Sequence, residues 1–180
     1  MATDTDAAAE EAAPAPAPEP EPERLHGALV ANVRGVPVAV ATADQYLPLM
    51  EGLHADGFDM LADLTAVDFL GHPGRRLPAG VEAGRFEVVA TVLSMAERRR
   101  VRVRAQVPEA EPRVASVFHL WPGCEAMERE VWDMLGIAFT GHPDLTRILM
   151  PEDWEGHPLR KDYPIGRVPV QFKATRNPAR

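Results

Sequence analysis

The stretch FEVVATVLSMAERRRVRVRAQV, residues 86–107, carries the clearest secondary-structure pattern in this chain of 180 residues. Residues 86–95 are largely apolar on both faces, which is typical of a central strand, whereas residues 100–107 alternate between apolar and polar side chains. A short turn around residues 96–98 joins them, so the pattern predicts a β-hairpin. The polar face of the second strand holds Arg100, Arg102 and Arg104. We interpret it as a solvent-facing or acid-paired sheet surface, with an anion or nucleic-acid platform as the alternative.

Upstream of this hairpin the sequence predicts a strand and a helix. Residues 33–41 are rich in Val and Ala but contain Pro37, which indicates an edge strand or an irregular hairpin because proline cannot donate to a ladder. Thr42 and Gln45 form a capping-box pattern at the start of a helix. Pro48 favours a start one turn later, and Gly57 fits its C-terminal end.

Four further segments complete the expected secondary structure. Residues 58–70 predict another strand, and residues 72–84 predict a loop because of their glycine and proline content. Apolar residues at i, i+3, i+4 and i+7 predict a short helix over residues 113–121. A second apolar stripe predicts a helix from about Pro122 to Gly136.

The order of these elements predicts the fold class. The strands precede the strongest helix, and no β-α-β alternation is sustained. We therefore expect an α+β fold, a two-layer domain with a mostly antiparallel or mixed sheet and flanking helices, plus an extended C-terminal arm. The predicted division is an acidic, Ala/Pro-rich disordered tail (residues 1–24), the α+β domain (25–136) and the arm (137–180).

Charge is distributed unevenly along the chain. The formal net charge is −8, and residues 1–23 hold seven acidic side chains and no Lys or Arg. The rest of the chain is nearly neutral, which argues against a general nucleic-acid-binding protein. Residues 157–180 carry six basic side chains against one acidic side chain. Because the arm has apolar and aromatic residues but no periodicity, we expect it to become ordered along another surface.

Few residues form a pattern typical of catalysis or cofactor binding. Neither GxGxxG nor GxxxxGK[ST] occurs. The single cysteine, Cys124, excludes a disulfide within the chain and an iron–sulfur cluster held by this chain alone. Its place on an apolar helix face indicates a small core residue. The longest apolar stretches are far shorter than the ~18 residues of a membrane span, and the acidic start does not resemble a secretory signal, so we expect a reducing compartment.

Two groups of polar residues allow a catalytic interpretation. His142, Asp144, Glu155 and His157 are candidates for a metal site, although both histidines stand in Gly-His-Pro steps typical of turns. On the second predicted helix, Glu128, Arg129, Glu130 and Asp133 present either a carboxylate pair for acid–base chemistry or an ion-paired face. Arg129 and Asp133 have the spacing of a helical ion pair, and we favour the ion-paired face, packed against a partner.

The stretch EREVWDMLGIAFTGHPDLTRILMPEDWEGHPLRKDYP, residues 128–164, resembles the signature region of the 30 kDa-type subunit of proton-pumping NADH:quinone oxidoreductase (respiratory complex I, NDH-1). Upstream, the DLTAVD run at residues 63–68, the WPG step at 121–123 and the RFEVV strand at 85–89 fit the same family. The resemblance covers about residues 30–165. It departs from the family at Thr146, where members often carry a basic residue.

The resemblance implies a scaffold subunit of the peripheral arm of that complex, with no cofactor and no independent active site in this chain. FMN and iron–sulfur clusters would belong to partner subunits, and NADH and quinone would be substrates of the whole complex. The chief partner would be the quinone-site subunit, a relative of the hydrogenase large subunit, beside neighbouring iron–sulfur subunits. The chain would contact the membrane only through the complex, on its cytoplasmic or matrix side.

From this resemblance we expect the charged helix and the arm to dock on a partner subunit. Trp154, Arg160, Asp162 and Tyr163 would anchor the arm. Two alternatives remain: the equivalent subunit of a membrane-bound hydrogenase-type complex, and a stand-alone metal-dependent hydrolase. The residues expected at the partner interface are Glu128, Arg129, Glu130, Asp133, His142, Asp144, Arg147, Trp154, His157, Arg160, Lys161, Asp162 and Tyr163.

Overall fold

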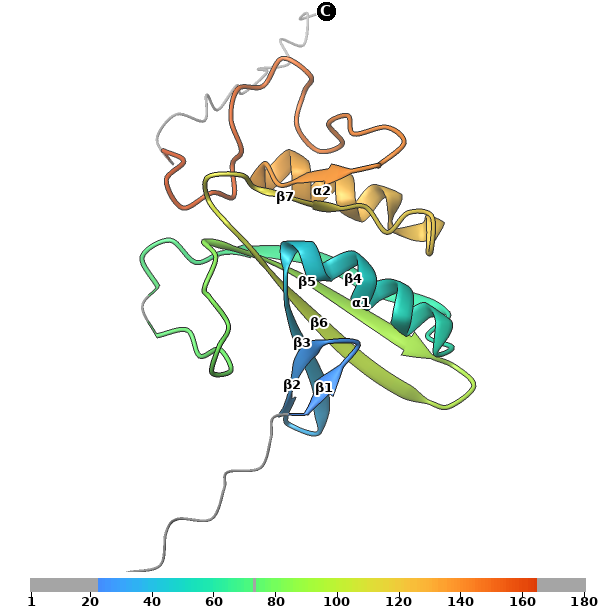
Figure 1. Cartoon of the computed structure of the whole chain (residues 1–180). Coiled ribbons are helices and arrows are strands. Elements are labelled where there is room, and N and C mark those ends of the chain that lie inside the picture. The colour runs from blue at the N-terminus through green and yellow to red at the C-terminus, as the bar shows by residue number, and fades with distance from the viewer. Residues whose placement is uncertain (1–22, 73, 165–180) are drawn as a thin grey trace, which may run out of the picture.

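The structure, a computed structural model, describes residues 23–72 and 74–164 as a six-stranded mixed sheet with helices on one side (Figure 1). The strand order in the sheet is β1-β2-β3-β6-β5-β4, and β7 and β8 form a separate parallel pair. This confirms the predicted α+β class. The elements are β1 (Arg24–Leu25), β2 (Ala28–Val33), β3 (Val36–Thr42), α1 (Ala43–Ala55), β4 (Met60–Asp68), β5 (Phe86–Ser94), β6 (Arg99–Val107), β7 (Arg113–Ala115), the 3-10 turn η1 (Pro122–Cys124), α2 (Glu125–Leu135) and β8 (Ala138–Thr140).

The β5–β6 hairpin lies at the centre of the sheet, as predicted. Phe86 pairs with Val107 and Ser94 with Arg99 in antiparallel register. β4 adds to the outer side of β5, and β3 joins β6 in parallel. The alternation in β6 sends its apolar side chains into the core, while Arg104 forms a two-point ion pair with the buried Glu87 on the opposite face. Arg100 and Arg102 are exposed there, in agreement with the favoured interpretation of this surface.

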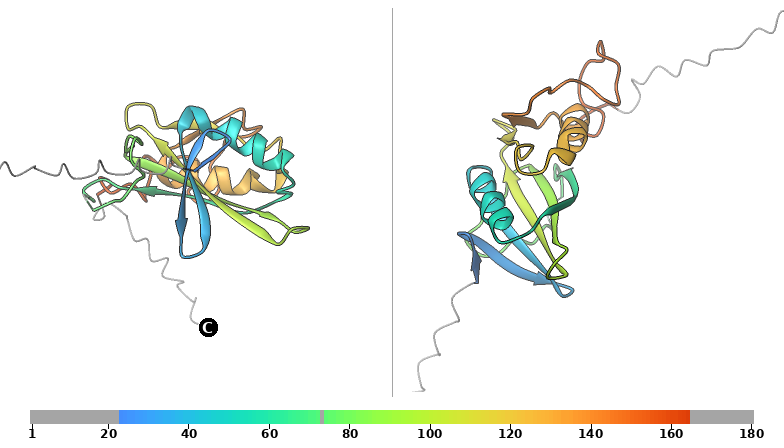
Figure 2. Two further views of the ribbon diagram at one scale, coloured as in Figure 1. Left: turned by 60° about the horizontal axis from the view of Figure 1, so that its bottom comes forward. Right: turned by 90° about the vertical axis from the view of Figure 1, so that its right-hand side faces the viewer.

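Both helices cover the same face of the sheet, so the domain has two layers (Figure 2). One core cluster contains Tyr46 and Leu49 of α1, Val131 and Leu135 of α2, and the inward residues of β3 to β6. Within the described part of the chain no helix covers the other face (Figure 2). No helix described in the structure is long and apolar enough to cross a membrane.

The segment with Pro37 is an inner strand of a hairpin, so the prediction of a hairpin is confirmed and that of an edge strand is wrong. β3 pairs with β2 on one side and β6 on the other. Pairing with β6 begins only at Val38, so Pro37 lies before the parallel ladder and removes none of its pairs. Arg34 and Gly35 form the turn with positive φ angles.

Helix α1 begins with the predicted capping box. The Thr42 hydroxyl accepts from the Gln45 N–H, and the Gln45 side chain accepts from the Thr42 N–H. The helix starts at Ala43 and keeps Pro48 inside it, so the expected later start is wrong. Four buried side chains of α1 pack the helix against the core despite the proline: Tyr46, Leu49, Met50 and Leu53.

The short helix predicted over residues 113–121 is wrong. Arg113–Ala115 is a strand, β7, which pairs in parallel with β8, and a turn follows it. Val114, Val117 and Trp121 are buried at the predicted spacing. A strand followed by a turn can bury these side chains just as a helix can. The strand forms here because residues 113–115 pair with β8, which lies about 25 residues further along the chain.

Residues 141–164 have no helix or strand and run across the C-terminal end of α2 (Figure 1). Together with Ile137 and β8, they form the described part of the predicted arm. The predicted tail, up to residue 22, and residues 165–180 of the arm lie outside the described residues.

Candidate functional site

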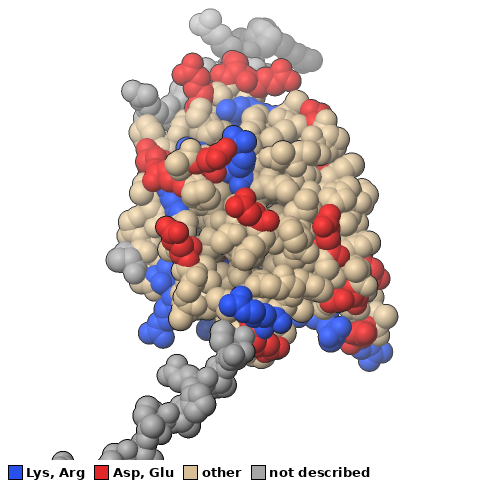
Figure 3. Space-filling model, viewed as in Figure 1, with Lys and Arg blue, Asp and Glu red and all other residues tan. Residues whose placement is uncertain are grey.

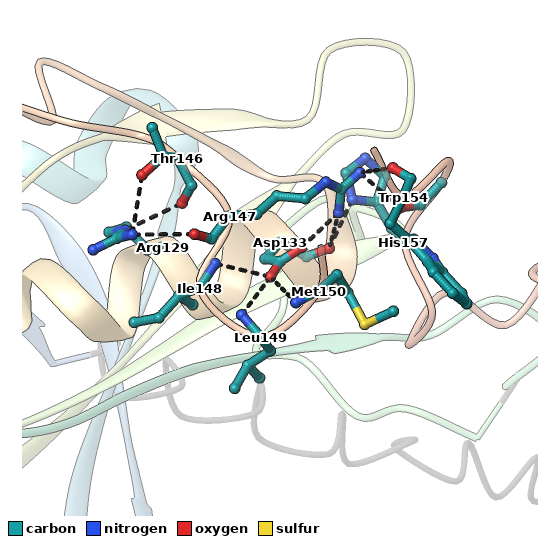
Figure 4. A network of polar contacts seen from close by, with 10 residues as sticks. Arg129, Asp133, Thr146, Arg147, Ile148, Leu149, Met150, Trp154 and His157 are labelled. Atoms are coloured by element: carbon teal, nitrogen blue, oxygen red, sulfur yellow. Dashed lines mark hydrogen bonds and ion pairs between the residues drawn. The ribbon is translucent and has the colours of Figure 1, made fainter. Parts of the chain in front are cut away.

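The arm is held at the C-terminal end of α2 by the buried carboxylate of Asp133 (Figure 4). One oxygen, Oδ2, accepts from the backbone N–H groups of Ile148, Leu149 and Met150 at 3.1, 2.8 and 2.9 Å. The other oxygen, Oδ1, lies 2.5 Å from Nη1 of Arg147. Burial opposes ionisation of Asp133, but these hydrogen bonds outweigh it and hold its pKa below the usual range.

Arg147 links Asp133 to a second turn of the arm. Its Nη2 donates to the carbonyls of Trp154 and Gly156 at 2.8 and 3.1 Å. The guanidinium also lies 5.7 Å from the ring centroid of Trp132 on α2. One planar side chain therefore joins the helix, residue 147 and residues 154–156.

The arm also satisfies the free carbonyls at the end of α2. His157 Nδ1 lies 3.0 Å from the Asp133 carbonyl oxygen, and the Leu159 N–H donates to the Met134 carbonyl at 2.9 Å. Arg160 Nε donates to the Leu135 carbonyl at 2.7 Å. The last carbonyls of a helix lack intrahelical partners, and basic side chains there suit the negative end of its dipole. The arm is thus the C-terminal cap of α2, and burial lowers the pKa of His157 in this position.

Gly136 lets the arm approach closely. Its φ of 72° lies in the left-handed region, where glycine is favoured after a helix. A Cβ on this residue would meet the His157 ring at 2.5 Å and Arg160 Nη2 at 2.8 Å. The position therefore requires glycine for its conformation and for the space that the arm occupies.

A second carboxylate, Asp68 at the end of β4, holds the arm farther on. Arg85 donates to both oxygens, at 3.0 and 2.9 Å, and the Lys161 backbone N–H donates to Oδ2 at 2.9 Å. Arg85 also pairs with Asp162 at 2.9 Å. Burial opposes the charge of Asp68, but these donors outweigh it and lower its pKa to about 2.

Arg129 holds the arm at residues 146 and 147. It donates to the Thr146 carbonyl at 3.1 Å, to the Thr146 hydroxyl at 3.0 Å and to the Arg147 carbonyl at 3.1 Å. Its ion pair is with Glu125, 3.0 Å away, and the predicted pairing with Asp133 is wrong because Arg147 occupies that carboxylate. Thr146, where the sequence departs from its family, thus offers two acceptors to Arg129.

Glu128 points into the domain interior. Its oxygens accept from the Ser116 hydroxyl at 2.6 Å and the Val117 N–H at 2.9 Å, and the Cys124 thiol lies 3.5 Å away. Glu128 and Asp133 have no exposed area, so neither side chain is a surface residue in this chain. Burial, with Glu128 beside it, raises the pKa of the Cys124 thiol, as expected for a core cysteine.

The contacts that hold the arm form a clamp, made by Asp68, Arg85, Arg129, Asp133 and Gly136 with the arm residues that they meet. The structure brings most of the predicted interface residues into this clamp but leaves several outside it. Glu130 and Asp144 are exposed, and His142 Nε2 lies 3.1 Å from the Glu125 carbonyl. No cluster of three or more potential metal ligands occurs within residues 23–72 and 74–164. Both histidines of the hypothetical metal site contact backbone carbonyls instead. Whether the predicted residues contact a partner stays a prediction.

Sequence reasoning missed three residues of the clamp: Asp68, Arg85 and Gly136. Asp68 and Arg85 stand in runs that carried the family resemblance, and Gly136 was the predicted helix end. The family motifs therefore included these residues, but neither run indicated that Asp68 would contact Lys161, which lies 93 positions further along the chain. The hydrogen bonds and ion pairs named above all join parts of this chain, whereas the buried indole N–H of Trp154 has no partner among the described residues. The site is built to hold a peptide segment.

Fold and site together define a class: a two-layer α+β domain extended by an arm that its own buried carboxylates clamp in place. Comparison with known proteins narrows this class. Residues 39–168 match the family described as respiratory-chain NADH dehydrogenase, 30 Kd subunit. The chain belongs to that family.

Individual relatives agree with this assignment. A Roseiflexus castenholzii protein, named as a subunit of NADH-quinone oxidoreductase, is 52% identical over 115 residues, which covers 64% of this chain and 60% of the relative. An Acidothermus cellulolyticus protein with the same name is 45% identical over 121 residues, covering 67% and 58%. NADH-quinone oxidoreductase subunit 5 from Thermus thermophilus is 39% identical over 160 residues, covering 81% and 74%. The chain spans only 46–58% of the length of three such curated relatives.

Two solved structures share the fold. A trypsin-resistant fragment of Nqo5 superposes with a TM-score of 0.59 at 35% identity, covering 66% of this chain and 90% of the fragment. A chain of the membrane-bound sulfane sulfur reductase, an archaeal respiratory membrane complex, gives a TM-score of 0.62 at 22% identity and covers 77% and 78%. The second likeness concerns the fold alone.

Proposed function

We propose that this chain is a scaffold subunit in the peripheral arm of a proton-pumping NADH:quinone oxidoreductase. The observation that carries this proposal is the family match, which includes the whole described clamp. In this role the chain supports electron transfer from NADH to quinone by holding the quinone-site subunit. FMN and the iron–sulfur clusters belong to partner subunits, and the chain sits on the cytoplasmic side of the membrane as a peripheral component.

The clamp supplies a physical basis for docking. Asp133 holds the backbone of residues 148–150, which leaves the side chains of Ile148 and Leu149 40% and 59% exposed. Leu159, also on the arm, is 56% exposed. Large apolar side chains on a pre-ordered segment can bind a partner pocket without a further cost of ordering the backbone. We assign these three side chains to the contact with the quinone-site subunit.

The alternative is the equivalent subunit of a hydrogenase-type or related membrane complex. The likeness to the sulfane sulfur reductase chain supports it at the level of the fold. The three curated relatives described above, at 39–52% identity, carry the NADH-quinone oxidoreductase name, which favours the first proposal.

Leu149→Asp tests the docking role. Burying a carboxylate in an apolar partner pocket is unfavourable, so we expect at least a ~10-fold loss of assembled complex in cells that express the variant. Met95→Asp is the matched control, because Met95 is 63% exposed at the β5–β6 turn and far from the clamp. Equal assembly of both variants, measured by affinity isolation and NADH:quinone activity, would contradict the assigned contact.

A further inference from the structure

An open groove lies at the end of the sheet that carries the β2–β3 and β5–β6 turns. Its volume is about 630 Å³. The apolar floor includes Pro37, Phe58, Leu93 and Val101. This groove is unrelated to the arm clamp and has no part in the proposed docking of Leu149.

The rim of the groove is basic. Arg98, Arg99 and Arg100 line it, and no acidic side chain does. Arg99 forms an ion pair with Glu97, two residues before it, whereas no ion pair of Arg98 or Arg100 is found among the described residues. Figure 3 shows several Lys and Arg side chains along this lower edge of the molecule, with Asp and Glu side chains among them. A ligand for such a groove should combine small apolar side chains with negative charge.

We propose that the groove binds the chain's own acidic Ala/Pro segment, residues 14–22, within the same molecule. That segment reads PAPAPEPEP, so its prolines suit the apolar floor and Glu19 and Glu21 suit the arginine rim. Proline-rich segments lose little conformational entropy on docking into apolar grooves. Residues 1–23 contain no basic side chain that would oppose the contact.

The attachment point of the segment makes this contact reachable. The Glu23 carbonyl accepts from the Val30 N–H at 2.8 Å, which fixes the start of the described chain beside β2. β2 runs from there to the turn at Gly35, which lines the groove. The distance along β2 is about five residues, ~16 Å at strand spacing. Nine residues in a polyproline conformation extend ~28 Å, so the segment can span this distance and lie in the groove. Tethering gives it an effective concentration on the order of millimolar, an advantage over a separate partner.

Paramagnetic relaxation in the full chain tests the contact. A nitroxide on Ala17→Cys reports on nearby backbone amides, and Cys124 is fully buried, which protects it from the label. We expect selective signal loss at Val36, Leu93 and Val101, decreasing by at least about two-fold in high salt because the rim contacts are exposed ion pairs. In a second sample, ¹⁵N-labelled chain without nitroxide is mixed with nitroxide-carrying chain that has no ¹⁵N. This sample should show no such loss, because the contact lies within one molecule.

A matched pair of variants completes the test. Arg98→Asn with Arg100→Gln should reduce the signal loss, since Asn tolerates the positive φ of Arg98. Arg76→Gln with Arg113→Gln, exposed arginines outside the groove with the same change in charge, should leave it intact. Three results would overturn the proposal: no signal loss at the groove, an equal reduction in both variants, or the same loss in the mixed sample, which would indicate a second copy as the occupant. Thermal unfolding verifies that each variant is folded.

Discussion

Asp133 shows how one buried side chain can order a segment that has no helix or strand. Its oxygens receive three consecutive backbone N–H groups and one guanidinium. A carboxylate with this many donors remains charged, and removing its charge leaves Arg147 without its counter-ion.

Asp133→Asn should therefore destabilise the chain by about 3 kcal/mol, because the amide offers one acceptor oxygen and brings donors against a donor-rich site. Denaturant unfolding of the full chain measures this change. Asp144→Asn, at an exposed position of the arm, is the control and should change the free energy of unfolding by less than about 0.5 kcal/mol. Similar values for the two variants would show that the Asp133 clamp contributes little.

Gly136→Ala separates backbone strain from crowding by the arm. Gly57 follows α1 with a φ of 85° and has open space around its Cβ position, whereas Gly136 faces His157 and Arg160. Both substitutions carry the left-handed penalty of about 1 kcal/mol. We expect Gly136→Ala to cost at least ~1 kcal/mol more than Gly57→Ala, as measured by thermal unfolding. Equal costs would mean that the arm does not pack against Gly136 in solution.

Because the pKa of Asp68 is lowered in the folded chain, we expect the chain to lose stability in acid. Its folded pKa of about 2 lies below the usual unfolded value near 4, so its contribution is complete above about pH 4 and disappears as the pH falls towards 2. The contribution is about 2 kcal/mol. Asp68→Asn should flatten the dependence of the free energy of unfolding on pH between about 5 and 2, and Asp63→Asn, exposed on the same strand, should not. An unchanged slope in Asp68→Asn would contradict this role.

Among the elements, α2 and the arm satisfy each other's hydrogen-bonding groups. The helix supplies carbonyls and Asp133, and the arm supplies the donors that both need. The sequence predicted α2, its end at Gly136, the capping box of α1 and the central hairpin, because each depends on local spacing. It did not predict β7 as a strand or β3 beside β6, because these pairings join segments about 25 to 65 residues apart.

Arg147→Lys tests the arm as an element. Lysine can keep the charge next to Asp133 but cannot reach the carbonyls of Trp154 and Gly156 at the same time. We expect opening of the arm to become ~10-fold more populated, which corresponds to about 1.4 kcal/mol. Chymotrypsin cleavage at the arm should accelerate accordingly, and the exposed control Arg113→Lys should be cleaved at the wild-type rate. Unchanged cleavage of Arg147→Lys would assign the arm's order to other contacts.

At the scale of the whole molecule, the two-layer domain and the clamp form one unit. The resemblance in sequence identified the family and the arm, since the motif residues lie in order along the chain. It did not show that Glu128 and Asp133 are buried inside the chain, because helical spacing alone cannot tell which packed surface a charged face meets. Because these two carboxylates are buried within the chain, the proposed partner contact rests on the exposed apolar side chains that they help to position.

Isolation of the full chain from its own cells tests whether it assembles into the proposed complex. With a tag before Met1, away from the arm, the chain should co-purify with subunits that hold FMN and iron–sulfur clusters, and the isolate should oxidise NADH with a quinone as acceptor. Recovery of the chain alone, or with hydrogenase or sulfur-reductase subunits and without NADH:quinone activity, would contradict the proposed function.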